Sequence, residues 1–167
     1  MLVILSQKMK SFLVIENALP EIEVLSMITK YEQLPFLFID DKEYSSYYRQ
    51  DFVDKDLSRK ICELVKDWFP SGRIGNKWYL TKYVKGGYID FHCDGHVSID
   101  NKRSKYTVLI YLNQDYEGGE LCFEERSKVI LKPGLGTIVV MDQDLWHKAN
   151  PLVSGTKYLL RADMVCI

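Results

Sequence analysis

Two of the chain's three histidines stand close together, in the stretch 88–96 that reads YIDFHCDGH. His92 and Asp94 are two positions apart, and residues two apart on a β-strand point to the same face. An imidazole and a carboxylate on one face can bind a single metal ion. His96 continues the same alternation, but it follows Gly95 and fits a surface position equally well.

The third histidine, His147, lies far downstream in the stretch DLWHKANP. Two histidines and one carboxylate occupy one face of a metal and leave three positions open, which is the ligand set of non-haem Fe(II) oxygenases. The histidine–aspartate pair alone is a weak signal, since such pairs occur by chance. From these ligands alone, a zinc-dependent hydrolase is also conceivable.

Two cations follow His147 in the last β-prone stretch, TKYLLRADMVCI. Lys157, Leu159 and Arg161 alternate, so they share one face of the predicted strand. A buried cation without a partner is costly, and an anionic ligand such as a dicarboxylate would remove that cost. The alternative is that one or both cations lie at the rim, in solvent.

Two amphipathic helices are predicted before these segments. The first begins at Pro20, and its apolar face is expected to contain Ile22, Leu25 and Ile28. The second covers 53–70 and is capped by an aspartate at position 54 or 56. The apolar face of the second helix is expected to comprise Leu57, Ile61, Leu64, Val65 and Trp68. A strand is predicted over 12–19, and strand and loop between the helices.

From Asn76 onward the chain is a series of short β-prone segments separated by KGG, NQDYEGG, KPGLG and NPLVSG. Many short strands at close spacing predict an antiparallel sandwich or barrel. We therefore expect an α+β protein with a jelly-roll core and N-terminal helices packed on one sheet. No linker or repeat divides the chain, so we expect a single domain over 1–167, helical at about 17–72 and jelly roll at about 76–167.

Charge and cysteine usage narrow the class of protein. The net charge is −1, so no global basic field attracts nucleic acid, and a nucleic-acid partner is not expected. The four cysteines form no CxxC pair, which indicates free, mostly buried thiols in a reducing compartment. The apolar N-terminus MLVIL is too short for a signal peptide or a membrane span. We expect a cytoplasmic protein without a membrane partner.

Three stretches together resemble a known family: YVKGGYIDFHCDG, YTVLIYLNQDYEGGELCF and KPGLGTIVVMDQDLWHKANPLVSGTKYLLRADM. They are similar to the 2-oxoglutarate- and Fe(II)-dependent dioxygenases of the prolyl 4-hydroxylase-like branch, over roughly 77–167. The resemblance is specific because HxD, YLN, GGE with a following Phe, PG, the distal His and a final-strand Lys recur in order. It implies a double-stranded β-helix, that is, a jelly roll preceded by helices.

The resemblance also implies roles for individual residues. His92, Asp94 and His147 would be the iron ligands, and Lys157 would hold the far carboxylate of 2-oxoglutarate, where many relatives have Arg. Tyr83 matches a tyrosine that lines the cosubstrate pocket. The cosubstrate residues also include Tyr111 and Thr107, which share a face of one predicted strand, and Arg161, which would assist Lys157 or face the substrate.

The implied reaction hydroxylates a C–H bond while 2-oxoglutarate is decarboxylated to succinate. It requires Fe(II), 2-oxoglutarate as cosubstrate and O₂, with ascorbate as a supporting reductant. The expected substrate, and therefore partner, is a protein or peptide, with a peptidyl residue such as proline as the target. The alternatives are a hydroxylase of a small molecule such as a free amino acid, and a non-catalytic metal-binding module on the same barrel. A nucleic-acid demethylase is disfavoured by the charge.

Overall fold

The computed structural model describes residues 2–7, 10–124 and 129–166, and it contains two helices and sixteen strands within those ranges. In chain order the elements are β1 (Leu2–Gln7), β2 (Lys10–Ile15), α1 (Glu21–Tyr31), β3 (Leu37–Asp41), β4 (Ser45–Val53), α2 (Lys55–Val65), β5 (Gly72–Tyr83), β6 (Tyr88–His92), β7 (Ser98–Ile99), β8 (Lys102–Arg103), β9 (Tyr106–Tyr111), β10 (Glu117–Gly118), β11 (Leu121–Phe123), β12 (Val129–Leu131), β13 (Ile138–Asp142), β14 (His147–Ala149), β15 (Leu152–Ser154) and β16 (Lys157–Cys166).

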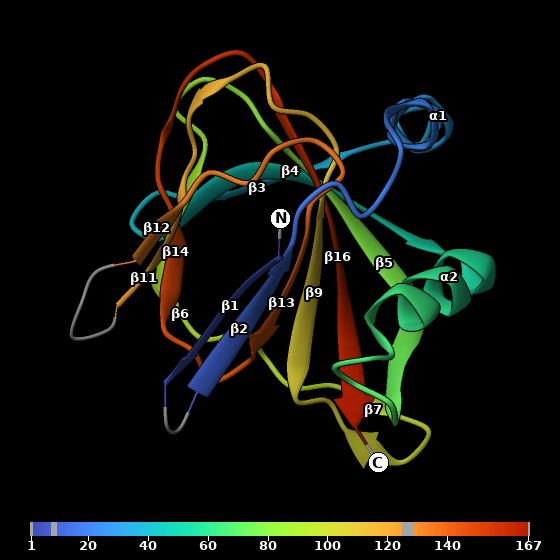
Figure 1. Ribbon diagram of the computed structural model, residues 1–167. Helices are drawn as coiled ribbons and strands as arrows, with labels where there is room; N and C mark the ends of the chain where they lie inside the picture. Colours follow the sequence, from blue (N-terminus) through green and yellow to red (C-terminus); the bar gives the residue numbers. More distant parts are fainter. Residues whose placement is uncertain (1, 8–9, 125–128, 167) are drawn as a thin grey trace.

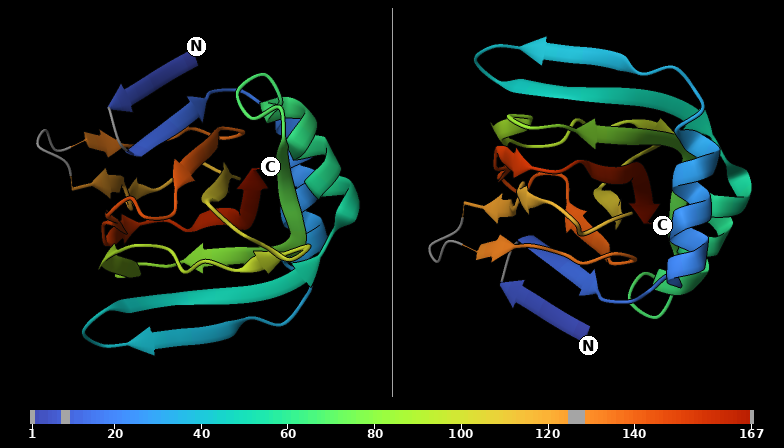
Figure 2. Two further views of the ribbon diagram at one scale, coloured as in Figure 1. Left: turned by 90° about the horizontal axis from the view of Figure 1, so that it is seen from below. Right: turned by 90° about the horizontal axis from the view of Figure 1, so that it is seen from above.

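Twelve strands of the described chain form one antiparallel sheet in the order β1-β2-β13-β9-β16-β5-β4-β6-β14-β11-β12, with β3 paired on β4. β4 joins the two halves, because it pairs with β5 along most of its length and with β6 at Ser45 and Ser46. The sheet curls over so that β6, β14, β11 and β12 face the larger half across an interior (Figure 1). Both helices lie outside the curl, at one side of the larger half (Figure 2). This arrangement confirms the expected α+β class with a jelly-roll core.

Strand alternation divides the core into two layers. On β5 and β16, Trp78, Leu80 and Leu160 point outward and pack in one cluster with residues of both helices. Leu159 of β16 and Tyr111 of β9 point inward, into a second cluster within the curl. The inward positions of β4, β5, β9 and β16 are therefore the ones that can line a site.

Helix α1 buries a different face from the one expected. Val24, Met27 and Tyr31 are its buried residues. Ile22 is instead 77% exposed and Leu25 47% exposed, so the prediction that these two belong to the buried face was wrong. Both sets recur at helical spacing, and the side on which the sheet lies decides between them.

Helix α2 follows its sequence closely. The Asp54 side chain accepts a hydrogen bond from the Leu57 amide at 2.8 Å, which identifies Asp54 as the N-cap. Leu57, Ile61 and Val65 are buried as predicted. The helix is also fixed to β5 by the Trp78 indole, which donates to the Ser58 hydroxyl at 2.9 Å.

Two smaller expectations have different outcomes. The segment between the helices, expected as strand and loop, is the β3–β4 hairpin. The four cysteines are free, but only Cys122 is buried, whereas Cys93 is exposed, so the expectation of mostly buried thiols was wrong. In the described parts of the chain, no helix is long and apolar enough to cross a membrane.

Candidate active site

The two histidines of the expected triad are brought together by strand pairing. His92 ends β6, His147 begins β14, and the two are direct partners in the antiparallel register. Their ring centroids are 4.3 Å apart. Asp94 follows β6, where its backbone amide donates to the Gln143 carbonyl at 3.0 Å. One nitrogen from each histidine and one Asp94 oxygen lie within 4.8 Å of one another, so the three residues can hold a metal ion.

Backbone contacts determine which ring nitrogen of each histidine faces Asp94. Nδ1 of His92 lies 2.7 Å from the Asp90 carbonyl, and Nδ1 of His147 lies 2.8 Å from the Leu145 carbonyl. A carbonyl only accepts, so we assign the proton to Nδ1 in both rings. In both rings Nε2 then carries the lone pair. Nε2 of His92 lies 3.6 Å from Oδ1 of Asp94, and Nε2 of His147 lies 3.9 Å from Oδ2 of Asp94. This tautomer is the one a metal requires.

The surroundings of Asp94 keep its carboxylate ionised. Burial opposes ionisation, but the positive charge of Arg161 and the hydrogen bond from Thr107 favour the carboxylate, so the pKa of Asp94 lies well below its usual range. The Thr107 hydroxyl donates to Oδ2 and fixes the carboxylate. Burial also lowers the pKa of His147, which keeps its imidazole neutral at physiological pH. Both shifts favour the protonation states that bind a metal.

Lys157 is the most unusual charge in the protein because its side chain is only 1% exposed. Its ammonium donates to the Gly119 carbonyl at 2.6 Å and lies over the rings of Tyr83, Tyr111 and Tyr116, 5.2 to 5.9 Å from their centroids. Within the described residues it has no carboxylate within ion-pair distance. Burial lowers the pKa of Lys157 to about 8, which is the response of a cation that lacks a counter-ion.

The segment Glu117–Gly119, part of a separator between β-prone stretches in the sequence, also contributes to this pocket. Gly118 has a φ of 76°, and a Cβ there would lie 2.4 Å from the Pro151 carbonyl oxygen, so this position requires glycine. Gly119 provides the carbonyl that accepts from Lys157. The sequence predicts a separator between strands here, whereas Glu117 and Gly118 pair with β15 as the short strand β10, and the backbone that follows contacts the buried cation.

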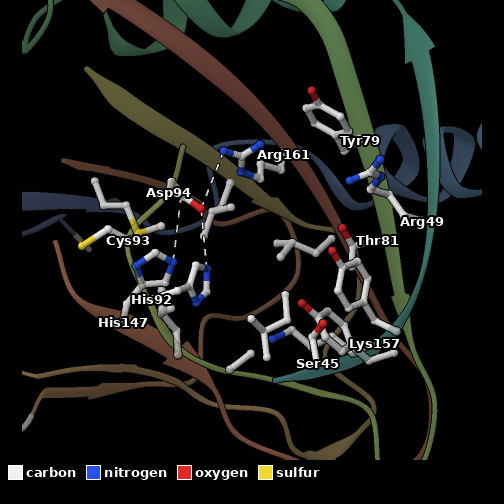
Figure 3. A pocket seen from close by; sticks show the side chains of 18 of the residues that line it. Ser45, Arg49, Tyr79, Thr81, His92, Cys93, Asp94, His147, Lys157 and Arg161 are labelled. Atoms are coloured by element: carbon white, nitrogen blue, oxygen red, sulfur yellow. Dashed lines mark ion pairs between the residues drawn. The ribbon is translucent and has the colours of Figure 1, made fainter. Parts of the chain in front are cut away.

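The triad and Lys157 line one cavity of about 310 Å³ inside the curl. Tyr83, Tyr111, Leu159 and Arg161 also line it, so the two cations of β16 both point inward rather than to a solvent-exposed rim. Figure 3 shows Lys157 and Ser45 at one end of the cavity, and Arg161, Tyr79 and Arg49 at the other. The remaining walls come from several strands: Tyr44, Tyr47, Thr81, Ile89, Cys93, Gly95, Leu109, Leu121, Met141 and Ala149.

Two residues close to the triad ligands in sequence, His96 and Cys93, do not belong to the triad. His96 binds the Ser104 carbonyl at 2.8 Å and the Asp144 carboxylate at 3.0 Å, and it is not part of the metal-binding group. Cys93 lies at the cavity, but its thiol points to the Asp144 carbonyl, 3.3 Å away. β4 contributes a wall of the cavity through Ser45, Tyr47 and Arg49.

The chain matches one protein-family model, described as the 2OG-Fe(II) oxygenase superfamily, over residues 78–162. That match spans half of the chain and includes all three triad residues and Lys157. The chain therefore belongs to the 2OG-Fe(II) oxygenase superfamily, a class of enzymes that use Fe(II), 2-oxoglutarate and O₂. A comparison with curated protein sequences found no match.

Similar solved structures support the fold. The viral collagen prolyl hydroxylase of Paramecium Bursaria Chlorella virus-1, solved with 2-oxoglutarate, is 20% identical, with a TM-score of 0.75 over 93% of this chain and 96% of that chain. The Pseudomonas putida prolyl-4-hydroxylase is 14% identical, with a TM-score of 0.74 over 95% and 94%. A Trichoplax adhaerens prolyl hydroxylase in complex with a hypoxia inducible factor peptide is 18% identical, with a TM-score of 0.73 over 93% and 83%. The predicted resemblance and the double-stranded β-helix fold are thus confirmed.

Proposed function

We propose that this enzyme hydroxylates a C–H bond of a peptidyl residue, with proline as the leading candidate. In this proposal His92, Asp94 and His147 hold Fe(II), and Lys157 binds the far carboxylate of 2-oxoglutarate. The observation that carries it is the combination of a two-histidine, one-carboxylate face with a buried cation that lacks an ionic partner among the described residues, both in one cavity.

The chemistry of the donor set fits Fe(II). Two imidazole lone pairs and one ionised carboxylate on one side leave the opposite coordination positions free for a chelating cosubstrate and O₂. The hydrogen bonds from Nδ1 of both histidines, and that from Thr107 to Asp94, hold the three ligand side chains in place. Fe(II) would use O₂ as the oxidant and 2-oxoglutarate as the co-reductant for hydroxylation, and the protein would supply position and a dry cavity.

Lys157 fits a carboxylate at the inner end of the cavity. An anion there would restore the partner that a buried ammonium needs, and its pKa would rise from about 8 because the charged form becomes stabilised. Tyr83 and Tyr111 flank the same position, and burial raises the pKa of both, so both phenols stay neutral as hydrogen-bond donors. Acting together, these residues orient the keto acid toward the triad.

The outer wall of the cavity supports a peptide substrate. Tyr44, just before β4, and Ser45 and Tyr47 of β4 line the cavity. Beside them, β3 pairs with β4 alone among the described strands, and its Leu37 and Phe38 side chains are exposed. An extended segment can pair with such a strand edge and place one residue at the cavity. Two of the similar structures are prolyl hydroxylases named for collagen or solved with a peptide, which supports the same substrate class.

The metal and cosubstrate roles are tested by anaerobic visible absorption of the metal-free protein on addition of Fe(II) and 2-oxoglutarate. We expect a charge-transfer band only when both are present, and no band in Asp94→Ala or His147→Ala. Circular dichroism of each variant checks that it is folded. A folded wild-type protein that binds metal but gives no band would show that the keto acid does not chelate there.

The substrate class is tested separately, by measuring succinate formation with a library of proline-containing peptides and with the free amino acids. Peptide-dependent succinate above the uncoupled rate, with a mass increase of one oxygen in the peptide, supports the proposal. Turnover with free amino acids alone would instead identify a small-molecule hydroxylase.

A further inference from the structure

The cavity end opposite Lys157 carries a second group of cations, one of which, Arg161, also lies beside Asp94 of the triad. Tyr79 of β5 lies between Arg49 of β4 and Arg161 of β16, whose guanidinium carbons are 5.2 and 5.4 Å from its ring centroid. The pairing of β16, β5 and β4 creates this wall, because Arg161 is the direct partner of Tyr79 and Arg49 is its diagonal neighbour. We call Arg49, Tyr79 and Arg161 the arginine wall.

The two arginines keep hydrogen-bond donors available to a ligand. Arg161 uses Nη2 alone for its contacts, 3.0 Å from Asp163 and 3.6 Å from Asp94. Arg49 uses Nε, 3.1 Å from Asp51. Among the described residues, the other nitrogens of both guanidiniums have no partner. Both side chains line the cavity, with 25% of Arg161 and 37% of Arg49 exposed.

The charges around the arginine wall leave one cation in excess. Arg49 and Lys77 share Asp51, and Arg161 pairs with Asp163. Asp94 also faces Arg161, but a metal in the triad would take that carboxylate as its own ligand. With the metal site occupied, the two arginines of the wall and the neighbouring Lys77 face two carboxylates, Asp51 and Asp163. A singly charged carboxylate matches this excess better than a doubly charged phosphate does, and the planar guanidinium fork suits its geometry.

We infer that the arginine wall is a recognition site for a carboxylate of the substrate, next to the carbon that is hydroxylated. This inference rests on the proposed function and assigns Arg161 to the substrate rather than to 2-oxoglutarate. Arg161 lies beside Asp94 while Lys157 lies at the far end of the cavity, so a carboxylate at the wall and the keto acid occupy opposite sides of the triad (Figure 3). The substrate carboxylate is either the α-carboxylate of a small molecule or chain end, or an acidic side chain in a peptide.

The test measures binding to Zn(II)-loaded protein with 2-oxoglutarate present, so that no turnover occurs. The probes are matched pairs that differ only in charge. N-acetyl amino acids are compared with N-acetyl amino acid amides, and capped tripeptides with Asp or Glu beside proline are compared with their Asn or Gln counterparts. Ligand-observed NMR gives each affinity. We expect one acidic series to bind about tenfold to hundredfold tighter than its neutral partner, as for a charge-assisted hydrogen-bond pair. The series that does so identifies the source of the carboxylate.

Variants link this preference to the wall. Arg49→Gln is expected to reduce the preference for the acid about tenfold or more. Arg59→Gln is the matched control, because it removes one arginine charge from α2, where the side chain is 80% exposed. Equal affinity of acids and neutral partners, or no binding by any acid, overturns the inference. An unchanged preference in Arg49→Gln does the same.

The same samples distinguish a failure of this inference from a failure of the proposed function. Affinity for 2-oxoglutarate is measured first in wild type and in Arg49→Gln, and it is expected to be similar in both. If the Zn(II)-loaded wild type fails to bind 2-oxoglutarate, the proposed function is wrong. If it binds 2-oxoglutarate but does not discriminate acids from their neutral partners, only the arginine wall assignment is wrong.

Discussion

The buried ammonium of Lys157 makes the affinity for 2-oxoglutarate depend on pH in a way that identifies the anchor. Without a ligand, burial lowers the pKa of Lys157 to about 8, so the side chain is charged at pH 7 and mostly neutral at pH 9. A bound carboxylate stabilises the charged form and raises this pKa. Above pH 8 the protein must therefore take up a proton to bind the cosubstrate, and affinity falls as pH rises.

The size of the effect follows from the position of this pKa. At pH 9, one unit above this pKa, Lys157 has lost its proton in about nine of ten molecules. The apparent dissociation constant for 2-oxoglutarate is therefore about tenfold higher at pH 9 than at pH 7. Tyr83, Tyr111 and His147, which also line the cavity, keep their charge over this window. Burial raises the pKa of Tyr83 and Tyr111 and lowers that of His147. The titration of Lys157 is thus the expected source of the change.

The measurement is calorimetric titration of 2-oxoglutarate into Ni(II)-loaded protein between pH 7 and pH 9, with Lys157→Arg as the matched control. A guanidinium stays charged over this range, so the variant is expected to show a nearly constant affinity. A constant affinity in the wild type, or an equal loss in both proteins, would refute the assignment of Lys157 as the titrating anchor.

Three further predictions concern stability, each measured by denaturant unfolding. Ser58→Ala removes the acceptor of the buried Trp78 indole and is expected to cost about 1–3 kcal/mol. Gly118→Ala is expected to destabilise the protein far more than Gly86→Ala. Both glycines have a positive φ, but of the two only the alanine at 118 would place its Cβ against backbone atoms. Burial opposes ionisation of Asp54, but its hydrogen bonds outweigh this and lower its pKa to about 2. Asp54→Ala should therefore cost about 2 kcal/mol at pH 7, and the difference should vanish as pH falls from about 4 towards 2.

Local rules were sufficient for much of the fold and for part of the cavity. The two-residue period of strands placed His92 and Asp94 together and turned Lys157 and Arg161 to one face, and the structure has this arrangement. The N-cap of α2 was also readable, because a capping aspartate acts within one turn of its own helix. Such features depend on neighbours in sequence, so a pattern in the sequence is enough to predict them.

Only the tertiary structure decided which helix face is buried and what forms the far wall of the cavity. In α1, Ile22 and Val24 belong to two apolar sets of equal period, and the position of the sheet selected the set with Val24. Arg49 and Arg161 come from distant parts of the chain, and they meet over Tyr79 only because β4 and β16 pair on opposite sides of β5. The sequence by itself determined which side chains each strand carries on each face. Strand order determined which of these side chains line the same cavity, because pairing between distant segments leaves no periodic pattern in the sequence.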